Sequence, residues 1–123
     1  MDTTSIDRWL AGYLEAWRSD TRPEIEALFS EDCEYFAAPY RPGMARNELV
    51  EYWLSEQESR IPWSCETEVL AREGDLHVVR ALVRYPAGED GASDPVVYHD
   101  VWLVTLDEDG RARRFVEHFM AEE

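Results

Sequence analysis

Hydrophobic residues recur at two spacings along the chain, and the change between them separates a mainly helical first half from a β-rich second half. At the start, Thr3, Thr4 or Ser5 can cap a helix. The apolar residues that follow at helical spacing, and so predict one buried stripe, are Ile6, Trp9, Leu10, Tyr13, Leu14 and Trp17. Asp20 and Thr21 break this stripe.

The next segment predicts a short helix, a short strand and a longer helix. Pro23 suits the first turn of a helix over residues 24–29, which would bury Ile25, Leu28 and Phe29. Residues 33–36 read as a strand that Pro39 stops, and residues 39–43 form a loop. A third helix is expected over residues 46–58, ended by Pro62. Its inward residues are Leu49, Val50, Trp53 and Leu54.

From Trp63 onward the hydrophobic period becomes two, which is typical of strands. Strands are expected over 63–72, 76–85, 96–106 and 111–120, with a long loop over residues 86–95. Helices come first and antiparallel strands last, so the chain is predicted to be a single α+β domain over residues 1–123. We expect three N-terminal helices packed on a strongly curved, mixed or antiparallel sheet that wraps around a pocket.

The last two strands form a hairpin around the turn Asp-Glu-Asp-Gly at residues 107–110. If Leu106 pairs with Arg111, Asp100 lies directly opposite Glu117. The same register places Tyr98 opposite Phe119 and Trp102 opposite Phe115. Directly opposed side chains share one face, about 5 Å apart at Cβ. One face of the hairpin is therefore predicted to carry two carboxylates within an aromatic frame.

The other face of this hairpin is predicted to form a subunit interface. It carries Val101, Leu103, Val116 and Met120, and His99 would lie opposite His118. We expect a homodimer through the face that includes His99, Val101, Leu103, Val116 and His118. The alternative for the two histidines, a metal site, lacks a third ligand. His77 lies near a turn and is expected to be exposed.

Composition narrows the classes of partner. The 123 residues contain 27 acidic side chains against 12 basic ones, all of them arginine, for a net charge of −15. Such a field repels nucleic acid and anionic membrane surfaces, so neither is an expected partner. Two cysteines, no leader and no long apolar run favour a reduced cytoplasmic protein. No phosphate loop, nucleophile motif or zinc motif is present, so no cofactor is expected.

The order of elements and several short stretches resemble the NTF2-like superfamily, particularly its SnoaL-like and ketosteroid-isomerase-like branches. The matching positions are 13–17, 25–32, Tyr35, Pro39, Gly43, Tyr52, Trp53, and the closing Asp-Gly-Arg and Phe-Val-Glu-His-Phe. The resemblance covers nearly the full chain and implies a cone-shaped fold around a pocket. It leaves the activity open, because the superfamily includes isomerases, cyclases, dehydratases, epoxide hydrolases and non-catalytic binding modules.

The resemblance also implies roles for single residues. Tyr13 and Asp100 match the tyrosine and the protonated aspartate with which ketosteroid isomerases hold a dienolate oxygen. Ala37 and Ala38 stand where those isomerases carry their general base. Tyr35 and Glu117 resemble two members of the catalytic set of limonene epoxide hydrolases, whose asparagine position is Ala37 here.

Two carboxylates in an apolar cavity do not ionise together easily, so one holds a proton that it can donate while the other acts as a base. Asp100, Glu117 and Tyr13 are therefore the candidate catalytic residues. The expected pocket-lining residues are Tyr35, Trp17, Trp53, Tyr98, Trp102, Phe115 and Phe119. The alternative is that Asp100 is structural, that Glu117 pairs with Arg46, Arg80 or Arg113, and that the aromatic residues form the core.

We expect a pocket for a small hydrophobic molecule, which it isomerises, cyclises or dehydrates without a cofactor. A non-catalytic binding module, or a dimeric interaction module, is the alternative.

Overall fold

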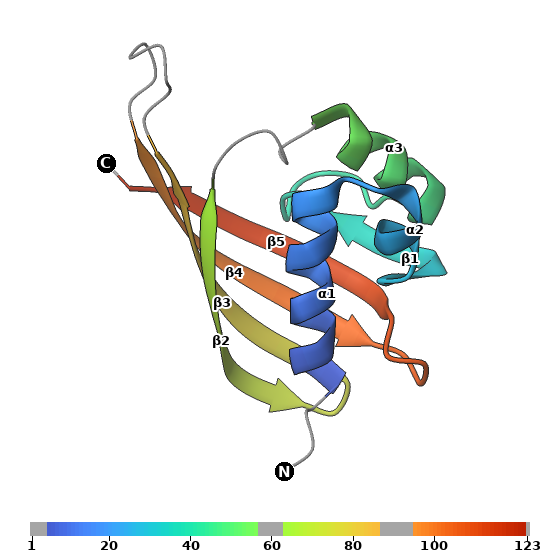
Figure 1. The fold of residues 1–123 in the computed structure, drawn as a ribbon. Coiled ribbons are helices and arrows are strands. Elements are labelled where there is room, and N and C mark those ends of the chain that lie inside the picture. The colour runs from blue at the N-terminus through green and yellow to red at the C-terminus, as the bar shows by residue number, and fades with distance from the viewer. Residues whose placement is uncertain (1–4, 57–62, 87–94, 123) are drawn as a thin grey trace.

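The computed structural model describes residues 5–56, 63–86 and 95–122, and its element order is the predicted one (Figure 1). The helices are α1 (Ser5–Ser19), α2 (Arg22–Glu26) and α3 (Arg46–Glu56). The strands are β1 (Phe29–Phe36), β2 (Ser64–Glu73), β3 (Leu76–Tyr85), β4 (Val96–Leu106) and β5 (Ala112–Ala121). The predictions for Thr3 and Thr4, for the end of the third helix, for Pro62 and for most of the 86–95 loop concern residues outside the described ranges.

The five strands form one mixed sheet in the order β1-β5-β4-β3-β2, so β4 is its central strand. β1 runs parallel to β5, and every other pair is antiparallel. The sheet curves around α1, while α2 and α3 lie beside the β1 edge (Figure 1). This arrangement confirms the α+β class. None of the described helices is long and apolar enough to cross a membrane.

An aromatic cluster fills the space between α1 and the sheet. The α1 stripe buries Trp9 and Tyr13, as its spacing predicts, and the α3 residue Trp53 closes on the same cluster. Phe115 of β5 is fully buried at its centre, with ring centroids of Trp9, Tyr13, Phe29, Tyr35 and Trp102 between 5.1 and 6.4 Å away. This packing fixes α1 against the face of β4 and β5 on which the two predicted carboxylates lie.

The boundary between α2 and β1 differs from the prediction. The sequence predicts that the helix continues to residue 29 and that a turn follows over residues 30–32. In the structure, the short helix ends at Glu26 and the strand already begins at Phe29. The reason is pairing with β5, because Ala112 N–H donates to the Leu28 carbonyl at 2.7 Å and Phe29 pairs with Ala112. Phe29 is buried as predicted, but by a strand rather than a helix.

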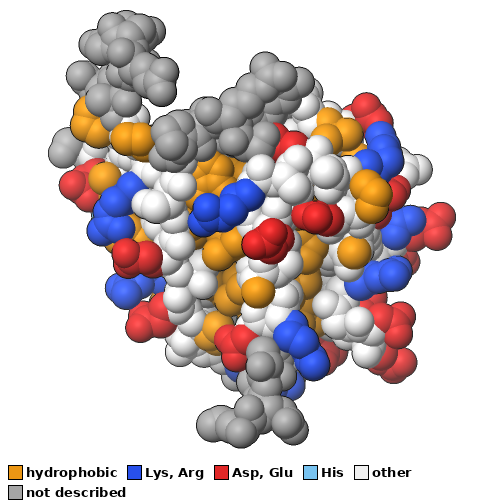
Figure 2. Space-filling model, in the orientation of Figure 1, with side chains coloured by type: hydrophobic (Ala, Val, Ile, Leu, Met, Phe, Trp, Pro, Cys, Tyr) orange, Lys and Arg blue, Asp and Glu red, His pale blue; other side chains and the backbone are white. Residues whose placement is uncertain are grey.

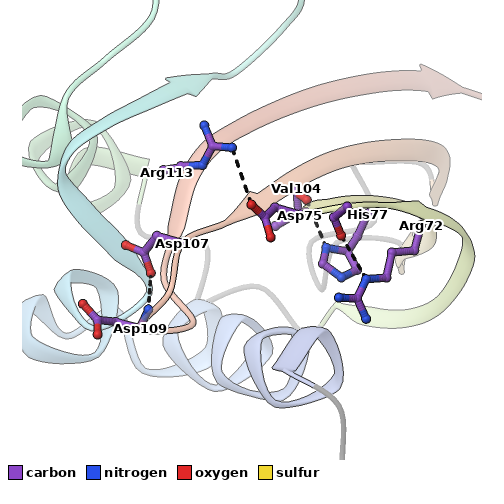
Figure 3. Close-up of polar contacts among 8 residues, drawn as sticks. Arg72, Asp75, His77, Val104, Asp107, Asp109 and Arg113 are labelled. Carbon is purple, nitrogen blue, oxygen red and sulfur yellow. Dashed lines mark hydrogen bonds and ion pairs between the residues drawn. The ribbon is translucent and has the colours of Figure 1, made fainter.

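The expectation that His77 is exposed was wrong. Its side chain is 4 % exposed, and Nδ1 lies 3.4 Å from the carbonyl oxygen of Val104 (Figure 3). The odd-numbered residues of β3 point toward the helix-covered face of the sheet, and His77, close to the turn, is one of them. The side chains around this end of the sheet that remain polar and exposed include Asp75 and Arg113, which form an ion pair at 3.9 Å.

Candidate active site

The closing hairpin has a different register from the predicted one. Asp100 lies opposite Phe119, Trp102 opposite Glu117, and Val104 opposite Phe115. Tyr98 and His99 lie opposite Ala121 and Met120, so neither the predicted Tyr98–Phe119 pair nor the predicted His99–His118 pair is directly opposed. Each partner on β5 is therefore displaced by two residues.

Two local features produce this displacement. The turn closes with Asp107 N–H donating to the Arg111 carbonyl at 2.8 Å, so Leu106 pairs with Ala112 rather than with Arg111. Gly110 adopts a left-handed φ of 80° in this longer turn. A bulge then leaves Arg113 without a partner on β4. The turn and the bulge each add one residue, so the predicted face of every β5 side chain from Phe115 onward is preserved.

Asp100 and Glu117 are diagonal neighbours on the helix-covered face. Diagonal side chains lie farther apart than opposed ones, but a long side chain can still reach across. The Glu117 carboxyl does so and hydrogen-bonds to Asp100. The structure thus brings the two predicted carboxyl groups together, through a different register from the one expected.

Asp100 is held in the interior by its neighbours on three strands. It is 4 % exposed, and Oδ2 accepts the indole N–H of Trp102 at 3.2 Å. Ala81 of β3 pairs with it on one side and Phe119 of β5 on the other. Among the described residues, no donor reaches the buried Oδ1 atom. Burial in this setting raises the pKa of Asp100, while the hydrogen bonds to Glu117 and Trp102 offset part of the increase.

Burial raises the pKa of Asp100 and the Glu117 side chain lowers it, so the two carboxyl groups influence each other's protonation. One carboxyl can donate a proton, and the other can accept one. Glu117 is partly exposed, whereas Asp100 is buried, so the pair spans the boundary between the core and the surface.

Tyr13 packs against Trp102, which lies beside this pair. Its ring centroid lies 5.0 Å from that of Trp102, the residue that donates to Asp100. Tyr35 is stacked on Phe115 with centroids 5.1 Å apart. Both tyrosines are buried, and Ala37 and Ala38 are buried at the end of β1, where the resemblance would place a general base.

The aromatic residues predicted to line a pocket fall into two groups. Tyr35, Trp53, Trp102 and Phe115 belong to the packed core. Trp17, Tyr98 and Phe119 lie at its margin, and Phe119 is 51 % exposed. Tyr98 contacts both Phe119 and Tyr85, with centroids 6.2 and 5.8 Å apart. A surface depression of about 370 Å³ lies at the opposite end of α1, beside Trp9 and Gly110.

Two residues, Cys65 and Arg18, were not singled out as site residues from the sequence, and both lie close to Trp63 or to the carboxyl pair. Cys65 lies on β2, and its thiol has a pKa raised to about 12, chiefly by burial and next by the charge of Asp100. Trp63 stacks on Trp17 with centroids 3.9 Å apart, and the Arg18 guanidinium lies 4.6 Å from the centre of the Trp63 ring. The alternating pattern that begins at Trp63 could have indicated which face of the strand Cys65 occupies. The residues that surround Cys65 depend on strand pairing, which this pattern does not reveal.

Two of the three arginines named as alternative partners of Glu117 form ion pairs with other carboxylates. Arg80 pairs with Glu68 at 3.1 Å, and Arg113 is the partner of Asp75. On the outer face, His99 Nε2 lies 2.8 Å from Glu122 Oε2. Within the described ranges, no three His, Cys, Asp or Glu side chains gather closely enough to hold a metal ion.

The family model for the SnoaL-like domain matches residues 10–118, from the α1 stripe to the end of the hairpin. The chain belongs to the SnoaL-like family. It is thereby placed in the NTF2-like superfamily, as the sequence resemblance predicted. No protein of curated function matches the sequence.

Solved structures share the fold of this SnoaL-like domain at low sequence identity. A protein assigned as a SnoaL-like polyketide cyclase from Shewanella putrefaciens CN-32 has a TM-score of 0.73 at 14% identity, covering 96% of this chain and 81% of its own. An LEH-like epoxide hydrolase from M. tuberculosis has a TM-score of 0.71 at 13% identity, covering 96% and 84%. A ketosteroid isomerase-like protein from Erwinia carotovora atroseptica SCRI1043 has 0.65 at 21%, covering 96% and 95%.

Proposed function

We propose that this SnoaL-like domain binds a small hydrophobic molecule beside Asp100 and Glu117 and catalyses a proton transfer on it without a cofactor. The reaction class is isomerisation, cyclisation or dehydration. The observation that carries the proposal is the hydrogen bond between a buried and a partly exposed carboxyl group. The similarity to proteins named as a cyclase, an epoxide hydrolase and an isomerase-like protein supports the same range of chemistry.

The two carboxyl groups take different roles in the proposed reaction. Burial favours the protonated form of Asp100, which donates its proton to a substrate oxygen. Glu117, the more accessible of the two, removes a proton from a substrate carbon. This step leaves Asp100 ionised, Glu117 protonated and the substrate as an enol. An isomerisation is completed when Glu117 returns its proton to a different carbon and the enol oxygen returns its proton to Asp100. Tyr13 would donate its hydroxyl to the same oxygen, which acquires negative charge as the carbon loses its proton.

A hydrophobic ketone tests this chemistry without knowledge of the natural substrate. The exchange of C–H for C–D next to the carbonyl of 2-tetralone in D₂O can be followed by NMR. We expect the protein to accelerate this exchange and Glu117→Gln to reduce the acceleration by roughly 10²- to 10⁴-fold. Glu108→Gln, an exposed change in the same hairpin, serves as the control.

The result also separates catalysis from binding alone. If 2-tetralone quenches tryptophan fluorescence but its exchange is not accelerated, the domain is a binding module and the catalytic part of the proposal is wrong. Asp100→Asn should retain ligand affinity while losing exchange activity. Equal exchange rates for the wild type and both carboxyl variants would contradict the proposed roles.

The outer face of the sheet is the proposed contact surface of a homodimer. Val101 and Met120 are 37% and 71% exposed there, beside His99, Leu103, Val116 and His118. Burying such side chains against a second copy would remove apolar surface from water. Light scattering should give twice the chain mass, and Val101→Glu should halve it, whereas Tyr40→Glu, in the loop after β1, should not. A wild-type monomer would overturn this part.

A further inference from the structure

Arg18 lies at the end of α1 that is nearest to the carboxyl pair. It is in the last turn of the helix, directly after Trp17. Its guanidinium is 4.6 Å from the centre of the Trp63 ring, and Trp17 stacks on the same ring at 3.9 Å. A cation over an aromatic face is attracted by the ring. Arg18 therefore has a preferred position over Trp63, although its side chain is exposed.

Strand pairing places this arginine and the carboxyl pair along one face of the sheet. Cys65 lies in β2, two residues after Trp63, which directly precedes the strand. It pairs with Val83, which pairs with Tyr98 on β4, two residues before Asp100. The charges of Arg18, Asp100 and Glu117 all act on the Cys65 thiol. Arg18 and the carboxyl pair are thus both close enough to the Cys65 thiol for their charges to act on it.

Among the described residues, Arg18 has no acidic partner, unlike several other arginines. Arg22, Arg80, Arg84 and Arg113 each form an ion pair, in a chain with 27 acidic residues. Within residues 5–56, 63–86 and 95–122, no carboxylate forms an ion pair with Arg18, and its recorded contact is the ring of Trp63. The guanidinium is therefore available to a negatively charged group on a ligand. Figure 2 shows hydrophobic side chains in a strip between α1 and β2, with basic side-chain atoms at its upper end.

We infer that Arg18 binds the carboxylate of the substrate, so that the molecule handled by this domain is a small hydrophobic carboxylic acid. This inference rests on the proposed acid–base site, because it concerns the orientation of the same ligand. The guanidinium forms two parallel hydrogen bonds to the carboxylate. The hydrophobic body extends along the Trp17–Trp63 stack, and its reacting carbon lies beside Asp100 and Glu117. Arg18 is thus a positioning residue, which sets the orientation of the substrate and takes no proton.

A matched pair of ligands tests this inference on the wild-type protein. 2-Naphthoate and 2-naphthamide have the same ring system and differ in the charge of one group. Calorimetry at pH 7.5 should show 2-naphthoate binding at least roughly tenfold more tightly, as expected for a hydrogen bond to a charged group. Arg18→Gln should remove this preference and leave the affinity for the amide unchanged, and Arg18→Lys should restore part of it. Arg8→Gln, on the same helix but at its other end, is the control.

The outcomes separate this inference from the proposed function. Absence of naphthoate binding, or equal affinities of the wild type for the two ligands, would overturn the role of Arg18. If Glu117→Gln still abolishes the exchange of 2-tetralone in that case, the acid–base site stands and the substrate is neutral. A preference for naphthoate that survives in Arg18→Gln would also overturn the inference. The comparison of ligands on the wild type needs no variant to fold.

Discussion

The carboxyl group of Glu117 on β5 reaches diagonally to the carboxyl group of Asp100 on the neighbouring strand β4 and forms a hydrogen bond with it. Asp100 is 4 % exposed. The indole of Trp102 donates to one oxygen of Asp100, and among the described residues no N–H group reaches the other. Four predictions follow from this pair and from the hairpin that aligns it.

Asp100 should make the stability of the protein depend on pH. Its pKa is raised above the ordinary value of 3.8 by burial, so the folded state binds its proton more tightly than the unfolded state does. The contribution of Asp100 to the free energy of unfolding is therefore fully present below about pH 3.8 and decreases as pH rises through the folded-state pKa. Asp100→Asn should lose this dependence, so the variant gains stability relative to the wild type as pH rises. Urea denaturation at several pH values measures the difference. Asp75→Asn, at an exposed site, is the control.

Trp102→Phe should steepen this dependence on pH. The indole N–H donates to Asp100 and lowers its pKa, so its loss should raise that pKa further. The variant should be less stable at every pH, because a fully buried side chain becomes smaller. The result that is specific to the lost hydrogen bond is a larger decrease in the free energy of unfolding between pH 4 and higher pH than in the wild type. Trp53→Phe is the matched control, since its indole donates at 3.2 Å to Asp20 instead. Parallel pH profiles for the two variants would contradict the role of Trp102.

Cys65 should react slowly with alkylating agents. Its pKa is raised to about 12 from 9.0, so its thiolate fraction at pH 8 should be about a thousandfold lower than that of a free cysteine. Mass spectrometry after treatment with iodoacetamide should show little modification at pH 8 and a steep increase by pH 10. Asp100→Asn should accelerate the reaction only modestly, since burial is the larger cause of the shift. Alkylation at the rate of the urea-unfolded protein would refute this.

Gly110→Ala should destabilise the hairpin by about 1 kcal/mol, because Gly110 has a φ of 80° that costs energy for a residue with a Cβ atom. No atom lies within 4 Å of the position that the new Cβ would occupy, so the cost is conformational rather than steric. Gly110→Asn should cost less, since asparagine tolerates this conformation better. Thermal unfolding measures both changes. Asp109→Ala, at the exposed neighbouring position, should change stability by less than about 0.5 kcal/mol.

Local patterns in the sequence predict the element order because helical and alternating spacings reflect burial directly. The α1 stripe and the alternation after Trp63 place both layers of the fold. The start of β1 at Phe29 was missed because it depends on pairing with Ala112 of β5, far along the chain. Local propensity carries no information about such a partner.

The sequence predicts which face of its strand each site residue occupies, but it does not predict which side chains contact one another. Alternation places Asp100 and Glu117 on one face whether or not the register is known, since the true register differs from the predicted one by an even number of residues. The contact of Trp102 with Asp100 depends on rotamers. The approach of Arg18 to Trp63 depends on how α1 packs on β2, and neither relation has a signature in the sequence.

The turn at Gly110 and the bulge at Arg113 also restrict how this hairpin can change in evolution. Gain or loss of a single residue between β4 and β5 would turn Glu117 outward and bring Val116 or His118 beside Asp100. A change of two residues would keep Glu117 on the inward face but bring Phe115 or Phe119 beside Asp100, whereas a single change with a compensating bulge would keep Glu117 in place. Homologues that retain the chemistry should therefore vary in hairpin length only where a bulge or a longer turn restores the register of Glu117.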